Sequence, residues 1–174
     1  MIEILDILSK RRSIRQFKDQ KIDKSILEQI LKAGLLAPSS KNKKPVEFIV
    51  VEDKDTIEEL KKCKSKGADA LTTASCAIVV IADSHLSDVW VEDASIATIL
   101  IQLAAENLGL GSIWIQMRKR FNDQGDAEEQ VRKLLKIPEK YGVLSIIALG
   151  HKDEEKQAYD IGELDFSKIK YHGY

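Results

Sequence analysis

The residues best suited to chemistry form a basic segment near the amino terminus. Arg11, Arg12, Ser13 and Arg15 place three guanidinium groups and a hydroxyl within five residues. A guanidinium binds phosphate through paired, charge-assisted hydrogen bonds, so the segment is a candidate anion site. Two alternatives stay open: a solvated charge run, or a contact with RNA or DNA. The second is weakened because no aromatic residues are interleaved with the arginines.

A second candidate is the segment APSSKNKKP at residues 37–45. Ser39, Ser40 and Asn42 gather two hydroxyls and an amide between two prolines, in a stiff loop rich in hydrogen-bonding groups. Such a loop could bind the edge of a planar heterocycle. The alternative is a plain connection between a helix and a strand, because turn residues of this kind are common in loops.

No catalytic motif accompanies these segments. The sequence contains no GxGxxG, Walker, HExxH or GxSxG pattern, and its three histidines lie far apart. The adjacent carboxylates Glu92 and Asp93 fit the first turn of a helix better than an acid/base pair. Cys76 is expected to be an inert thiol in a buried strand and Cys63 an incidental residue at a helix end, so neither a disulfide framework nor a metal site is expected.

Composition excludes several classes of protein. The chain has 174 residues, of which 44% are hydrophobic and 32% charged, and its formal net charge is −1. These values predict one soluble globular domain spanning residues 1–174, with no general attraction to nucleic acid or membranes. We find no apolar run of the ~20 residues that cross a bilayer and no secretory signal, and so expect a cytoplasmic protein.

Hydrophobic periodicity predicts the elements that position these segments. Helices are expected over residues 2–10, from Asp23 or Ser25 to before Pro38, from a Thr56–Glu59 capping box to about Cys63, from about Ser87 to Gly109, and from about Asp126 to Pro138. Strands are expected at residues 47–51, 77–82, 112–115 and 143–149, each buried on both faces. The mixture predicts a layered α+β or α/β fold.

Two stretches suggest a partner. Residues 94–105 contain no charge and predict a helix buried all round, which a domain this small can hardly enclose. We therefore expect a second subunit to cover one side of it, since twofold dimers are the commonest oligomers. Residues 151–174 carry irregularly spaced apolar side chains, which favour an extended arm that docks on the partner chain over a frayed tail.

Taken together, these segments resemble the nitroreductase family of flavin enzymes. RRSIRQF is similar to the family's opening arginine-serine motif, and LLAPSSKNKKP is similar to its APSSxNxQPW loop. The family's long central helix and the strand after it resemble residues 92–116, EDASIATILIQLAAENLGLGSIWIQ. Its final strand and turn resemble residues 147–152, IALGHK. The resemblance implies an α+β fold with a central, mostly antiparallel sheet flanked by helices, in an intertwined homodimer that binds FMN at its interface.

The resemblance also implies the roles of individual residues. The FMN phosphate and ribityl chain would be held by Arg11, Arg12, Ser13 and Arg15, and the isoalloxazine lined from the other subunit by Pro38, Ser39, Ser40 and Asn42. Ile115 and Gln116 would pass the flavin N5 and O4 edge, and Gly150 and Lys152 would add a phosphate contact. No catalytic side chain is implied, because the flavin N5 carries the hydride.

Two residues depart from the family pattern and bear on the activity. Lys44 replaces the usual glutamine, and it either stabilises the anionic reduced flavin ring or points to solvent. Val46 replaces the usual tryptophan, a change that would reshape the substrate pocket. The implied function is a ping-pong oxidoreductase that takes hydride from NADH or NADPH and passes it to nitroaromatics, quinones or similar electron-poor molecules. The alternatives are a flavin-binding sensor or carrier without turnover, and an FMN-free module that binds nucleic acid.

Overall fold

A four-stranded antiparallel sheet forms the centre of the protein. In the computed structural model, which describes residues 4–174, its strands are β1 (Val46–Val51), β2 (Cys76–Asp83), β3 (Leu110–Gln116) and β6 (Tyr141–His151). Their spatial order is β1-β2-β6-β3, and every neighbouring pair is antiparallel. The central strands β2 and β6 are buried except at their ends, which explains their apolar, β-branched sequences.

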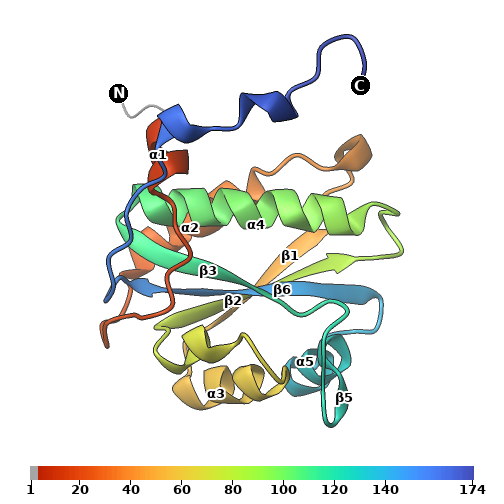
Figure 1. Ribbon diagram of the computed structural model, residues 1–174. Coiled ribbons are helices and arrows are strands. Elements are labelled where there is room, and N and C mark those ends of the chain that lie inside the picture. Colours follow the sequence, from red (N-terminus) through yellow and green to blue (C-terminus); the bar gives the residue numbers. More distant parts are fainter. Residues whose placement is uncertain (1–3) are drawn as a thin grey trace.

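Helices cover both faces of this sheet (Figure 1). α2 (Lys24–Leu35) and α4 (Trp90–Asn107) lie on one face, and α3 (Lys54–Lys62) and α5 (Ala127–Leu135) lie on the other. Ile146 and Ile147 are neighbours in β6 but belong to different hydrophobic clusters, because successive side chains of a strand point to opposite faces. The predicted α+β architecture is confirmed.

The remaining elements are short. α1 (Ile4–Lys10) precedes the basic segment, and residues 2 and 3 of the helix predicted there lie outside the described residues. β4 (Phe121–Asn122) and β5 (Gly125–Asp126) form a small hairpin before α5. Single turns of 3-10 helix occur at Ser40–Asn42, Asp69–Thr72, Ile161–Glu163 and Phe166–Lys168.

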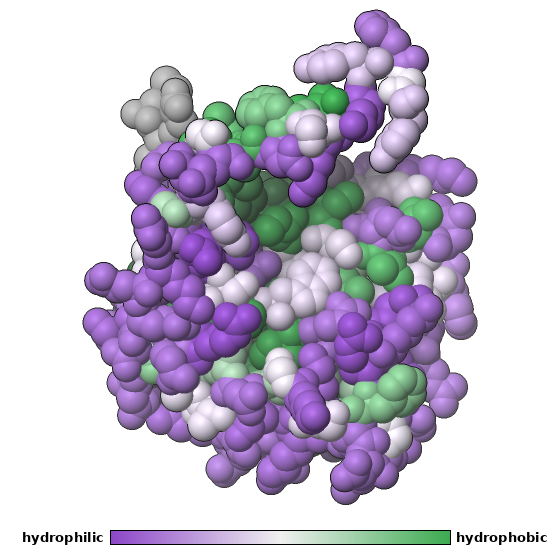
Figure 2. Space-filling model, viewed as in Figure 1, coloured by the Kyte–Doolittle hydropathy of each residue, from purple (hydrophilic) through white to green (hydrophobic). Residues whose placement is uncertain are grey.

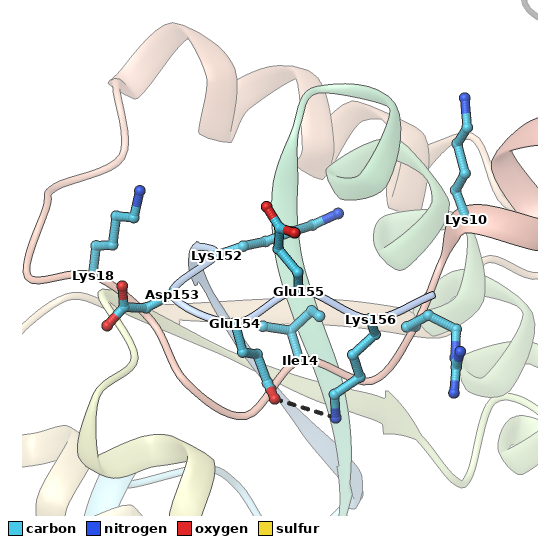
Figure 3. Close-up of a pocket in the computed structure, with 9 residues that line it drawn as sticks. Lys10, Ile14, Lys18, Lys152, Asp153, Glu154, Glu155 and Lys156 are labelled. Carbon is cyan, nitrogen blue, oxygen red and sulfur yellow. Dashed lines mark ion pairs between the residues drawn. The ribbon is translucent and has the colours of Figure 1, made fainter. Parts of the chain in front are cut away.

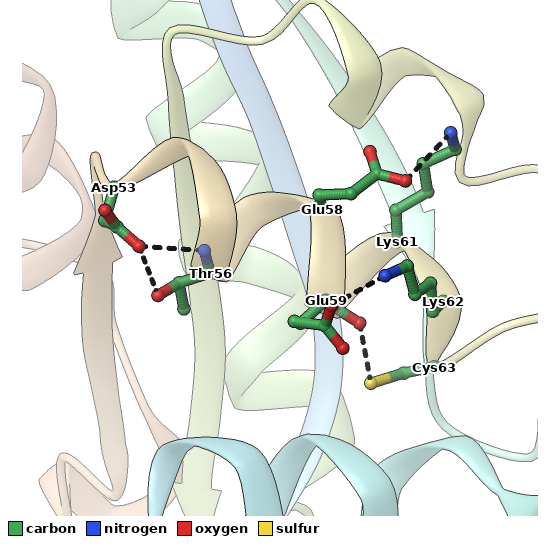
Figure 4. A network of polar contacts seen from close by, with 7 residues as sticks. All are labelled: Asp53, Thr56, Glu58, Glu59, Lys61, Lys62 and Cys63. Atoms are coloured by element: carbon green, nitrogen blue, oxygen red, sulfur yellow. Dashed lines mark hydrogen bonds and ion pairs between the residues drawn. The ribbon is translucent and has the colours of Figure 1, made fainter.

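The capping box predicted for the third helix is wrong. α3 begins at Lys54, because Asp53 is its N-cap: its carboxylate accepts hydrogen bonds from the Thr56 main-chain N–H (2.8 Å) and hydroxyl (2.6 Å), as Figure 4 shows. These bonds favour the ionised carboxylate and hold the pKa of Asp53 below its usual value. Asp23 stands at the N-cap position of α2 but makes no side-chain capping bond.

Burial on both faces was predicted for all four strands, and this is wrong for β1. β1 lies at the edge of the sheet, so most of its residues are only half-buried and Glu47 is exposed. Cys76 is buried as expected, and Cys63, for which no burial was predicted, is buried as well. Burial raises the pKa of the Cys76 thiol to about 12, and it also raises that of Cys63 at the end of α3.

Within the single chain the long helix is not buried all round, and burial of its open side by a second subunit stays a prediction. One stripe of α4, including Ala97, Ile101 and Ala105, is fully buried against the sheet and α2. The opposite stripe is open: Ile96 is 39% exposed and Ile99 37%. The helix also begins at Trp90, three residues after Ser87. Figure 2 shows apolar surface over this helix, below the carboxy-terminal segment.

The carboxy-terminal segment leaves the body of the protein, as Figure 1 shows. Residues 157–174 are all exposed, including the large apolar side chains of Leu164, Phe166 and Ile169. The segment is tied to its own chain at its start, where the Tyr159 N–H donates to the Ser9 carbonyl (2.9 Å). The Arg12 guanidinium lies over the Tyr159 ring, 4.3 Å from its centroid.

Candidate functional site

The basic segment lies along the ends of β3 and β6. Ser13 pairs with Ser112 of β3, and Phe17 pairs with Lys152 just after β6. Glycines permit this approach: a Cβ on Gly111 would stand 2.8 Å from the Ile14 side chain, and one on Gly150 would stand 3.0 Å from the Phe17 side chain. The tight packing fixes the main chain of the segment.

A pocket of about 520 Å³ opens beside this segment (Figure 3). Its lining includes Arg12 and Lys152, two of the predicted phosphate ligands, together with Lys10, Ile14, Lys18 and the acidic and basic run 153–156. Arg11, Ser13, Arg15 and Gly150 are close in the chain to these residues but do not line the pocket. Lys10, Lys18 and Lys156 were not predicted from the sequence, although the charged run DEEK after the last strand was a signal for Lys156.

One carboxylate that lines the pocket is held by groups of the chain itself. The carboxylate of Glu154 accepts hydrogen bonds from the main-chain N–H groups of Arg15 and Gln16, and the Lys156 ammonium lies 3.4 Å from it. The first of these main-chain bonds, with Arg15, is the main reason that the pKa of Glu154 is lowered. Adjacent N–H groups and cationic side chains that bind a carboxylate also suit a phosphate, so the residues fit the phosphate end of a flavin nucleotide.

Lys152 is directed at a second carboxylate. Its ammonium lies 2.7 Å and 2.9 Å from the two oxygens of Glu106, near the end of α4, and both side chains are largely buried. A phosphate bound here would share Lys152 with Glu106. Arg12 is also engaged, since it donates to the Gln157 carbonyl.

The polar loop is found at the opposite end of α4. Ser39 holds it closed, since its hydroxyl accepts the Lys44 N–H (2.7 Å) and its carbonyl accepts the Asn42 N–H (3.0 Å). The Ser40 N–H donates to the buried carboxylate of Asp93 (2.8 Å). Pro38, Asn42 and Lys44 are exposed, while the two serines are half-buried. The predicted flavin loop is therefore preformed in the single chain.

Ile115 and Gln116 end β3 on opposite faces of the sheet. Ile115 is buried in the cluster under α3 and α5, so its main chain rather than its side chain could face a ligand. The Gln116 amide is fixed by two hydrogen bonds, one from the Trp114 indole N–H (2.9 Å) and one to the Arg118 carbonyl (3.0 Å). The Arg118 guanidinium lies 5.5 Å from the Trp90 ring at the start of α4.

The predicted residues thus form two groups, one at each end of α4. Asp93 contacts the first group, the loop, and Glu106 contacts the second group, at the phosphate pocket. These two residues are thirteen positions apart in α4, which corresponds to about 20 Å along the helix axis. One chain therefore does not bring the loop beside the basic segment.

Comparisons with known proteins decide the family. A sequence model described as the nitroreductase family matches residues 8–70 and 62–151. The chain belongs to the nitroreductase family. An Archaeoglobus fulgidus relative, provisionally named an NADH dehydrogenase/NAD(P)H nitroreductase, is 42% identical over 164 residues, which cover 92% of this chain and 91% of the relative.

Solved structures of nitroreductases agree with this assignment. An FMN-dependent nitroreductase from Clostridium difficile R20291 has a TM-score of 0.95 at 49% identity, covering 98% of this chain and 99% of that one. A provisionally named nitroreductase of Desulfovibrio desulfuricans, solved in complex with FMN, has a TM-score of 0.76 at 25% identity, covering 98% and 99%. The predicted fold of the family is confirmed.

Other classes of site are not found in residues 4–174. Within this range no helix is both long and apolar enough to span a bilayer. The same residues contain no cluster of three or more histidine, cysteine, aspartate or glutamate side chains that could hold a metal ion.

Proposed function

We propose that this member of the nitroreductase family passes hydride from NADH or NADPH to nitroaromatics, quinones or similar electron-poor molecules by a ping-pong scheme. As the family implies, the chain is a flavin-dependent NAD(P)H oxidoreductase that uses FMN. The observation that carries the proposal is the carboxylate of Glu154 in the basic pocket, which accepts the main-chain N–H groups of Arg15 and Gln16 and lies 3.4 Å from the Lys156 ammonium.

The residues of the chain bind and orient the cofactor. FMN, when bound, supplies the hydride chemistry, so the protein needs no nucleophile of its own. Arg11, Arg12, Ser13 and Arg15 are assigned to its phosphate and ribityl end, with Gly150 and Lys152 beside them. Pro38, Ser39, Ser40, Asn42 and Lys44 are assigned to the isoalloxazine, and the main chain at Ile115 and Gln116 to its N5 and O4 edge.

We further propose that the site is shared between two chains of a homodimer. The open stripe of α4 (Ile96, Ile99, Leu100 and Leu103) continues onto the exposed side chains of Leu5 and Leu8 in α1, and a patch of this kind marks an interaction surface. A twofold axis across α4 would set two copies of the helix antiparallel. The loop at the start of one α4 would then lie beside the basic segment at the end of the other.

The carboxy-terminal arm is assigned to the same interface. Residues 157–174 are all exposed and carry several large apolar side chains, and we propose that these dock on the partner subunit. The arm begins beside the phosphate pocket, where Arg12 meets Gln157 and Tyr159. Docking of the arm would therefore stabilise the cofactor site as well as the dimer.

Two measurements test the proposed function. The purified protein is expected to be yellow, and its denaturation is expected to release FMN. Steady-state oxidation of NADH or NADPH should then depend on an added acceptor such as menadione or a nitrofuran. A yellow dimer without turnover would favour a flavin sensor or carrier, and a colourless protein whose nucleic-acid binding falls steeply with salt would favour a binding module.

A further inference from the structure

We propose that Asp93 is a positioning residue that holds the loop at residues 39–44 in the conformation that lines the flavin. The inference rests on the proposed function, because it assumes that this loop contacts the isoalloxazine. Asp93 lies in the first turn of α4 and is only 3% exposed. One carboxylate oxygen accepts the Ser40 N–H (2.8 Å), and the other accepts the Ser87 hydroxyl (2.8 Å).

The loop needs such an anchor because its backbone is strained. Lys41, Asn42 and Lys44 have φ values of 51°, 53° and 49°, in the left-handed region that non-glycine residues rarely adopt. Residues in this conformation persist only where the surrounding structure imposes it, and they cluster at ligand-binding sites. Within the loop, the bonds made by Ser39 close the turn but do not attach it to the helix.

The main-chain attachment of the loop to the helix passes through Asp93, and the Lys43 ammonium adds a side-chain bond to the Leu86 carbonyl (2.7 Å) in the connection before α4. The Ser40 N–H is the main-chain donor that the loop offers to α4, and a carboxylate accepts it more strongly than a neutral group would. Ser87, fully buried in the connection before α4, uses its hydroxyl on the same carboxylate. The carboxylate therefore joins two connections that are far apart in the sequence.

The position of Asp93 also favours a charged group. A negative charge is stabilised at the amino-terminal end of a helix, which offsets part of the cost of burying this carboxylate. The neighbouring Glu92 is exposed and makes no contact with the loop among the described hydrogen bonds. Glu92 thus offers a matched control: an acidic residue in the same helical turn that has no role in the proposed anchor.

Limited proteolysis with trypsin tests the anchor without relying on activity. The loop contains two cleavable lysines, Lys41 and Lys43, whereas Lys44 precedes a proline. Asp93→Ala should leave the half-buried Ser40 N–H without its carboxylate partner, and we expect loop cleavage to accelerate about tenfold. Asp93→Asn keeps one acceptor for Ser40 and should fall between this variant and the wild type. Glu92→Ala should behave as the wild type does.

FMN titration of the same variants tests the link to the cofactor. Asp93→Ala should raise the Kd for FMN by about tenfold, with Asp93→Asn restoring most of the affinity and Glu92→Ala unchanged. The proposal is overturned if loop cleavage in Asp93→Ala matches the wild type, if it accelerates equally at lysines throughout the chain, or if FMN affinity is unaffected by a loosened loop. If the wild type itself binds no FMN, the proposed function fails, while proteolysis still decides whether Asp93 anchors the loop.

Discussion

The two ends of α4 hold the two halves of the proposed site by different physical means. At the start of the helix, Asp93 binds an N–H group and a hydroxyl, and its charge is favoured by the helix dipole. At the other end, the Glu106 carboxylate stands where the dipole disfavours a negative charge, and Lys152 compensates it in an ion pair. The comparison predicts that the loop contributes through its fixed conformation, and that FMN affinity at the phosphate end depends on the net charge there.

The largest effect on FMN affinity is expected at the phosphate end of the site, in the double variant Arg11→Ala/Arg15→Ala. Each change removes a charge-assisted contact with phosphate worth roughly 1.5–3 kcal/mol, so FMN affinity should fall by at least about 100-fold. A titration of the cofactor-free protein with FMN, monitored by flavin fluorescence, measures the change in Kd. Riboflavin, which lacks the phosphate, should bind the variant and the wild type alike.

A matched control for this pair is Arg120→Ala, which removes an exposed guanidinium near the β4–β5 hairpin. It should leave FMN affinity unchanged. Unchanged affinity in the Arg11/Arg15 variant would mean that the basic segment does not bind the phosphate. The two ends of α4 could then no longer be contrasted as a loop end and a phosphate end.

At the loop end, a change of charge at Lys44 should alter the redox potential of the flavin, whereas changes that loosen the loop should weaken FMN binding. Lys44 is exposed and held at φ 49° by its N–H bond to Ser39. If its ammonium lies near the flavin N1–O2 edge, Lys44→Met should shift the FMN midpoint potential negatively by about 30 mV, which corresponds to about 1.4 kcal/mol for two electrons. Lys41→Met, in the same loop, is the control. An unshifted potential would remove this role from Lys44.

The smallest effect is expected from Glu106→Gln. Freeing Lys152 and removing a negative charge near the phosphate should tighten FMN binding by roughly fivefold, about 1 kcal/mol at an effective dielectric near 20. The gain should disappear in the Lys152→Met background, which a double-mutant cycle measures. Weaker binding in Glu106→Gln would show instead that the ion pair positions Lys152, and the two ends of α4 would then be alike in function.

Local patterns in the sequence predicted much of the fold. The apolar runs of β2 and β6 and the periodicity of α2 and α5 gave elements within about three residues of those observed, because each pattern reports burial directly. The start of α3 was misplaced, since Asp53 and Thr56 compete as caps and only the geometry shows which side chain meets the free N–H groups. β1 shares the apolar character of the central strands, so its edge position could not be predicted.

The candidate site was predicted in part for a similar reason. The arginine segment and the 37–45 loop are continuous in the sequence and could be recognised as motifs. Glu154 contacts Arg15 across 139 positions of the chain, Lys156 contacts Ser13 across 143, and Asp93 contacts Ser40 across 53. Contacts of this kind depend on tertiary folding: the charged run DEEK shows that residues 153–156 could take part in a site, but the sequence does not show which residues they meet.

The central claim is that each FMN is held by two chains, and complementation tests it most directly. Co-expression of the Arg11→Ala/Arg15→Ala chain with a Ser39→Ala/Asn42→Ala chain, carrying different affinity tags, yields a mixed dimer that can be purified. If the site is shared, one site of that dimer carries both defects and the other carries none, so one FMN per dimer should bind with wild-type affinity. Two equally weakened sites, or a protein that stays monomeric with excess FMN, would contradict the claim.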